Sequence, residues 1–178
     1  MSTPAFEDIR LFINAAWDGD TEGMKAYIDK FPDALEATKG EPIHWTAMMW
    51  AAQADKPMSI GLLLDRGAQI DARDANGQTP LMLAAHRGNA TTVAFLIERG
   101  ADVLLRDDKG QTAADCARRQ DKFATAVLLD GVTQARQQAM ADAERREQDE
   151  LARAARAVQD QMRATARSRR FKLNWGTS

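Results

Sequence analysis

The sequence contains an internal repeat with a period of 33 residues, and this feature limits the possible folds more than any other. The segment from Trp45 to Gln69 aligns without a gap with the segment from Gln78 to Asp102, 33 positions later. The motif Asp-x-x-Gly-x-Thr, which begins at Asp74, returns at Asp107. Chains with such periods fold as stacks of similar units, in which each unit buries its apolar face against its neighbours.

A fourth, divergent copy opens the chain. Its Ala15-Ala16 pair lies 36 residues before Ala51-Ala52, so three residues are inserted near Phe31–Pro42. The sequence therefore predicts four copies, at about residues 8–40, 41–73, 74–106 and 107–131.

Within each copy, local signals predict two helices. Thr46, Thr79 and Thr112 stand where a helix needs a capping side chain, and Pro80 follows at the first helical position, where its missing N–H costs nothing. Glycines such as Gly100 are typical of the left-handed residue that ends a helix. The first helices carry alanine pairs that allow close approach, whereas the second helices carry large apolar side chains.

The motifs Asp-x-x-Gly-x-Thr-Pro-Leu, Ala-Ala-x-x-Gly and Leu-Ile-x-x-Gly-Ala-Asp at this period resemble the ankyrin repeat, over about residues 8–131. The family's histidine after Thr-Pro-Leu is replaced here by Met49, Met82 and Asp115. The resemblance implies an all-α solenoid of helix-turn-helix units with short hairpin fingers, within a domain at residues 1–131. It also implies a protein-binding module with no catalytic residues and no cofactor.

Residues 132–170 predict a long helix, because they are rich in Ala, Arg, Glu and Gln and contain neither Gly nor Pro. Leu151, Ala155, Val158 and Met162 follow a 4-3-4 spacing over two heptads, fewer than the three or four on which a coiled-coil prediction rests. Two interpretations stay open. The helix is either solvated on all sides, or it is an arm that docks on a partner through Leu151, Val158 and Met162.

Charge is distributed unevenly along the chain. Residues 1–130 hold 14 basic and 20 acidic residues, whereas residues 131–178 hold 10 and 6. The basic residues Arg169 and Arg170 precede Phe171 and Trp175, a combination that suits a contact with a protein or with RNA. The simpler expectation for residues 171–178 is a flexible terminus.

Enzyme and metal chemistry lack support in the sequence. Cys116 is the only cysteine, and neither His44 nor His86 has a carboxylate or thiol at metal-ligand spacing, so we predict no metal site. Cys116 and His86 occupy neighbouring positions on adjacent first helices, but no third residue orients the histidine, and a structural cysteine is the better interpretation. The sequence shows no membrane span and no signal peptide, and we expect a cytoplasmic protein.

Ankyrin folds resemble a cupped hand, with fingers at the hairpin tips and first helices as the palm, and partners usually bind the concave side. The resemblance places nine residues at variable positions of that side: Trp17, Trp45, Trp50, Gln53, Gln78, Leu83, His86, Gln111 and Arg119. Tryptophan is enriched in interface hot spots. The alternative is that the three tryptophans pack on each other, or under the insertion at Phe31–Pro42, and seal the first repeat.

The leading functional hypothesis is an adaptor, assembly factor or inhibitor that binds one protein in the concave groove, with the C-terminal helix as a second contact. The alternative is a nucleic-acid-associated or assembly-embedded protein whose basic arm makes the main contact. An enzyme that uses Cys116 and His86 is the weakest hypothesis.

Overall fold

A computed structural model of the chain describes residues 4–32, 35–38 and 44–175, and side chains up to residue 166. Within these residues the regular structure is helical, and an isolated bridge between Thr38 and Thr46 is the one β contact. The helices are α1 (Phe6–Asp18), α2 (Thr21–Lys30), α3 (Ala47–Gln53), α4 (Pro57–Asp65), α5 (Pro80–Arg87), α6 (Ala90–Glu98), α7 (Ala113–Arg118) and α8 (Phe123–Trp175).

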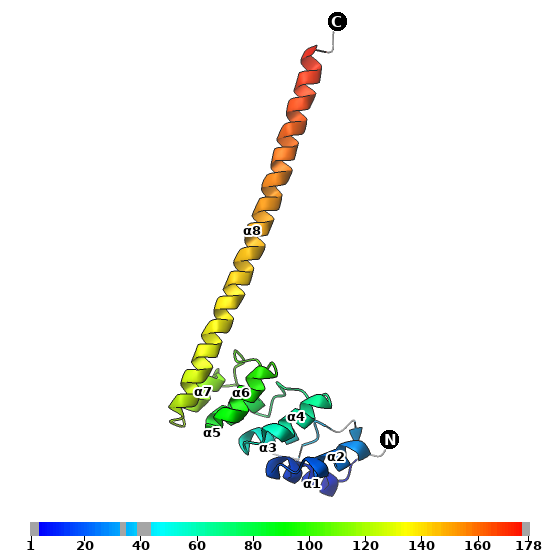
Figure 1. Ribbon diagram of the computed structural model, residues 1–178, viewed down its shortest axis with the longest axis vertical. Helices are drawn as coiled ribbons and strands as arrows, with labels where there is room; N and C mark the ends of the chain where they lie inside the picture. The colour runs from blue at the N-terminus through cyan, green and yellow to red at the C-terminus, as the bar shows by residue number, and fades with distance from the viewer. Residues whose placement is uncertain (1–3, 33–34, 39–43, 176–178) are drawn as a thin grey trace. The chain divides into compact units, whose positions relative to one another are not determined.

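The helices up to the start of α8 form successive pairs that stack in chain order, as Figure 1 shows for α1/α2, α3/α4 and α5/α6. Successive first helices (α1, α3, α5, α7) pack more closely than successive second helices (α2, α4, α6). The first helices therefore line the shorter, inner side of the stack. The predicted all-α solenoid, followed by a long C-terminal helix, is confirmed.

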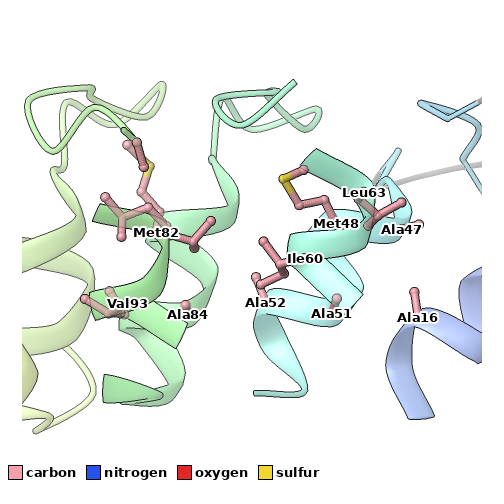
Figure 2. Close-up of a cluster of buried hydrophobic side chains, with 14 of the residues drawn as sticks. Ala16, Ala47, Met48, Ala51, Ala52, Ile60, Leu63, Met82, Ala84 and Val93 are labelled. Carbon is pink, nitrogen blue, oxygen red and sulfur yellow. The ribbon is translucent and has the colours of Figure 1, made fainter. Parts of the chain in front are cut away.

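Alanines explain this close packing of the first helices. Ala16, Ala51, Ala52 and Ala84 are completely buried, and each occupies a point where one pair meets the next (Figure 2). The second helices contribute larger side chains, among them the fully buried Ile60, Leu63, Val93 and Leu96.

The predicted caps are confirmed. The hydroxyl oxygens of Thr46, Thr79 and Thr112 each accept a hydrogen bond from the backbone N–H three residues later, which satisfies a donor that the helix itself leaves free. Gly67 and Gly100 follow the second helices with φ values of +93° and +97°, a conformation that side chains disfavour.

The fingers are tight turns. The N–H of Asp74 donates to the carbonyl of Gln78 (3.0 Å), and Asp107 bonds Gln111 in the same way (2.9 Å). No strand forms in the described residues on either side of these turns. We call residues 74–78 and 107–111 the second and third fingers.

Hydrogen bonds join each repeat to the next. The side-chain amide of Asn89 donates to the carbonyls of Ala52 and Gln53 (3.0 Å each), at the end of the preceding first helix. The hydroxyl of the buried Thr92 donates to the Asp55 carboxylate (2.6 Å). Further bonds between neighbouring repeats join Arg66 to Asp29, Arg99 to Asp65, Arg73 to the Arg106 carbonyl, and the Asp102 N–H to Asp71.

Helix α8 begins as the second helix of the fourth copy and continues across the boundary expected at residue 131. Ala126 and Leu129 are buried and Val132 packs against the core, whereas most side chains from residue 134 to residue 166 are exposed. The chain divides into two compact units, Met1–Thr133 and Gln134–Ser178. The buried contacts of α8 thus belong to the first unit.

We expect the second unit to be dispensable for folding of the first. A chain that ends at Thr133 keeps Leu129 and Val132, and it loses Met140, whose side chain is 52% exposed. Urea unfolding of this chain, compared with the full chain, should give the same midpoint within about 0.2 M, because repeat stability comes from neighbouring interfaces. If the truncated chain is insoluble or unfolded instead, residues after 133 are needed to cover the last repeat.

Candidate functional site

Three tryptophans meet on the inner side of the first two repeats. Trp50, on α3, lies between Trp17 on α1 and Trp45 in the segment before α3. The ring centroids of Trp50 and Trp17 are 5.7 Å apart with an interplanar angle of 70°, and those of Trp50 and Trp45 are 4.7 Å apart at 67°. Both are favourable edge-to-face contacts. We call these residues the tryptophan cluster.

A hydrogen bond anchors the cluster to the second finger. The indole N–H of Trp45 donates to Oδ2 of Asp74 at 2.8 Å. Oδ1 of the same carboxylate accepts from the backbone N–H groups of Asn76 and Gln78, both at 2.8 Å. One buried carboxylate therefore holds the finger turn and the orientation of Trp45 together.

The other two tryptophans differ in what they present to solvent. Trp50 is half-buried and packs against the core, and its indole N–H is buried without an acceptor among the described residues. Trp17 is 37% exposed. A buried donor without an acceptor typically costs about 1–3 kcal/mol, and local costs of this kind are typical of functional surfaces.

A polar hollow of about 440 Å³ adjoins Trp17. It lies where the first helices end, and it is lined by Trp17, Asp18, Gln53, Ala54, Asp55, Lys56, Arg87 and Asn89. Side chains of both charge signs surround it. The sequence singled out Trp17 and Gln53 from this set but missed Asp18, Lys56 and Arg87.

The structure brings together only some of the predicted groove residues of the later repeats. Arg119 is exposed, and its guanidinium donates to the side-chain oxygen of Gln111 at 2.7 Å, so the last palm and finger positions are joined. Gln78 and His86 are half-buried. Leu83 is 4% exposed and offers a partner almost no surface.

Burial lowers the pKa of His86, and the nearby charges of Arg87, Arg119 and Lys122 lower it further. His86 is therefore neutral near pH 7, and it contributes hydrogen-bonding atoms rather than charge to this part of the inner side.

The predicted tail contacts lie on α8. Leu151, Val158 and Met162 are 65%, 52% and 67% exposed, respectively. Arg169, Arg170, Phe171 and Trp175 are in the helical backbone of α8, but their side chains lie outside the described residues.

Cys116 has the properties of a structural cysteine. It is 3% exposed, and burial, with a smaller contribution from Asp107, raises the pKa of its thiol to about 11. Such a thiol is a poor nucleophile at neutral pH. Among the described residues, no group of three potential metal ligands occurs, and no helix has the length and apolarity needed to cross a bilayer.

The family model for ankyrin repeats, which spans three copies, matches residues 12–107 and again residues 48–138. The chain belongs to the ankyrin-repeat family. A search of curated proteins finds no match. Ankyrin repeats generally mediate protein–protein interactions, and the family typically consists of binding modules without enzymatic activity.

Within this ankyrin domain, the alkylation rate of Cys116 is a direct measure of its burial and pKa. At pH 8 a thiol with a pKa of about 11 has roughly a hundredfold less thiolate than one at its ordinary value of 9.0. We expect iodoacetamide to modify the native chain at least about a hundred times more slowly than the urea-unfolded chain. Equal rates would show that Cys116 is accessible and that its pKa is not raised.

The ankyrin repeats also explain why the sequence did not reveal the whole surface. Asp74 recurs as Asp107 and was recognised only as part of the turn motif, yet Asp74 also orients Trp45. The charged residues of the hollow lie at the last residue of a first helix or in the turn after it, outside the palm and finger positions. The repeat alignment shows where these charged residues lie in each copy. They come together around one hollow only because the repeats stack.

Proposed function

We propose that this protein binds another protein through the tryptophan cluster and the adjoining hollow, and that it acts as an adaptor, an assembly factor or an inhibitor without catalytic activity of its own. The observation that carries the proposal is the ordered row of Trp17, Trp50 and Trp45 on the inner side of the stack, with Trp17 partly exposed.

The arrangement of the cluster suits a binding hot spot. Truncation of tryptophans at the centre of interfaces typically costs about 2 kcal/mol or more. Trp45 is held by Asp74, and Trp50 is held between two rings, so little side-chain entropy remains to be lost on binding. A preorganised aromatic surface of this kind favours an apolar or aromatic side chain of a partner.

The hollow supplies the polar part of such an interface. Asp18, Lys56 and Arg87 line it together with the partly exposed Trp17. An apolar centre with a polar edge of mixed charge is the usual anatomy of a specific protein interface. It favours a partner segment that carries an apolar anchor flanked by residues of both signs.

A second candidate function is binding of nucleic acid through the basic end of the chain. It is favoured by residues 163–172, which contain five basic residues and no acidic one. Binding through this segment would weaken steeply as salt increases, because each phosphate contact releases counterions. Binding through the tryptophan cluster would depend much less on salt.

The test is affinity capture from the native host with three baits: the full chain, a Trp17→Ala/Trp50→Ala chain, and the chain that ends at Thr133. Mass spectrometry at about 0.1 and 0.5 M salt identifies the captured species. The proposal predicts a protein that the full and truncated chains retain at both salt concentrations and the double variant loses. Capture that needs residues after 133 and disappears at high salt would favour the nucleic-acid function.

A further inference from the structure

Helix α8 carries a narrow apolar stripe that no described residue covers. We call Leu151, Ala155, Val158 and Met162 the seam. Its three large side chains are 52–67% exposed, and Ala155 is also exposed. The other side chains around this part of the helix are small, polar or charged, and Arg163 pairs with Asp160 within the helix at 3.8 Å. A helix that is polar on most sides gains stability when a narrow apolar stripe is covered.

We propose that the seam is covered by the seam of a second copy of this chain, in an antiparallel helix pair. In one register, Leu151 of each copy lies opposite Met162 of the other, and Ala155 lies opposite Val158. Neighbouring registers, displaced by one heptad, place several seam residues opposite polar positions. The register with matched seams is the one that covers all four residues at once.

The charge distribution of α8 selects the antiparallel orientation. In this register, residues 141–150 of one copy lie opposite residues 163–172 of the other. The first segment contains five acidic and two basic residues, and the second contains five basic residues and no acidic one. An antiparallel pair therefore brings opposite net charges together at both ends. A parallel pair would place each segment beside its own like charge.

The same register explains the position of Met140, which is 52% exposed on α8. Met140 and Trp175 are 35 residues apart, which is five heptads, so they occupy equivalent heptad positions. Both positions lie beside the seam, one residue before a position that continues its spacing. In this register residue 140 of one copy lies opposite residue 173 of the other, two residues from the helix position of Trp175.

The interface contains few large apolar layers, so we expect a reversible dimer. The fraction of dimer should depend on protein concentration, and the affinity should depend on salt. Each dimer would carry two tryptophan clusters and could bind two copies of a partner or one symmetric partner. Such bivalence raises the apparent affinity without any new contact to the partner.

Sedimentation velocity of the full chain, from about 5 to 500 µM, tests the self-association. Val158→Asp is expected to raise the dissociation constant of the dimer at least tenfold. Ala157→Asp introduces the same residue one position earlier, on the side of the helix away from the seam. It should change the dissociation constant less than about twofold. Circular dichroism checks that both variants keep the same helix content. Raising the salt from about 0.05 to 0.5 M should weaken the wild-type dimer several-fold.

Cysteine cross-linking tests the orientation. Under a mild oxidant, a mixture of Leu151→Cys and Met162→Cys chains should form a disulfide-linked heterodimer, whereas Leu151→Cys chains alone should cross-link poorly. The native Cys116 is buried and serves as the background in all samples. Efficient cross-linking of Leu151→Cys alone would overturn the antiparallel arrangement.

Three further outcomes would overturn the proposal. One is a wild-type chain that stays monomeric over the whole concentration range. Another is a Val158→Asp chain that associates as strongly as the Ala157→Asp chain. A chain that associates only after addition of an RNA oligonucleotide would also refute self-pairing and would assign the basic segment to nucleic acid.

Discussion

Replacing Leu63 with alanine is expected to lower the free energy of unfolding by about 2–5 kcal/mol. Leu63 lies on α4, its side chain is completely buried, and it belongs to the contact between helix pairs that Figure 2 shows. Its truncation leaves a cavity, because the neighbouring helices cannot close over the missing atoms. Urea unfolding followed by circular dichroism measures the change.

Leu151→Ala is the matched control, because it makes the same chemical change at a side chain that is 65% exposed. Its effect should stay within about 0.5 kcal/mol in dilute solution. If Leu63→Ala costs less than about 1 kcal/mol, the contact between the second helices contributes much less to stability than its burial indicates.

Replacing Trp50 with alanine is expected to lower the affinity for the partner at least tenfold, about 1.4 kcal/mol, while the isolated protein keeps most of its stability. Trp50 touches both other tryptophans, so its loss removes the packing that orients Trp17 and Trp45. The loss of its contacts with the core is partly offset, because the variant no longer buries an indole N–H without an acceptor. Calorimetric titration with the captured partner gives the affinity.

Denaturant unfolding of the same variant separates binding from folding. If Trp50→Ala destabilises the chain as much as Leu63→Ala, the tryptophans are core residues that seal the first repeat. The binding surface would then lie on the fingers or on α8. A change of affinity with unchanged unfolding would assign Trp50 to the interface.

The elements with local causes could be predicted from the sequence. A capping threonine bonds an N–H only three residues away, and the glycine after a second helix needs only its own positive φ, so both are visible in a short motif. The period then arranges these motifs into a stack, because each pair needs a neighbour to bury its apolar face.

The geometry of the tryptophan cluster could not be predicted in the same way. The alignment placed the three residues on the inner side, but whether they face a partner or each other depends on side-chain rotamers and on contacts between repeats. The bond from Trp45 to Asp74 spans 29 residues and exists only after two repeats have stacked. The structure gives these tryptophans mutual contacts and also leaves Trp17 partly exposed.

The start of α8 was also hidden from the sequence. The expected bounds ended the fourth copy at residue 131 and began the long helix at residue 132. A glycine inside a helix costs roughly 1 kcal/mol relative to alanine. Here Gly131 lies within α8, between Leu129 and Val132, which pack against the last repeat. Tertiary packing on both sides of the glycine outweighs its local preference.

Among the described residues, the hydrogen bonds between repeats named above join one repeat to the next, as those of Asn89 and Thr92 do. Thermal opening therefore needs to break only one interface when it starts at an end of the stack, but two when it starts in the middle. Backbone amides of α5 and α6 should exchange with deuterium more slowly than those of α1 and α2. Trp17 and Trp50 lie on either side of the first interface, so a partner bound across them would hold closed the repeat that otherwise opens most often.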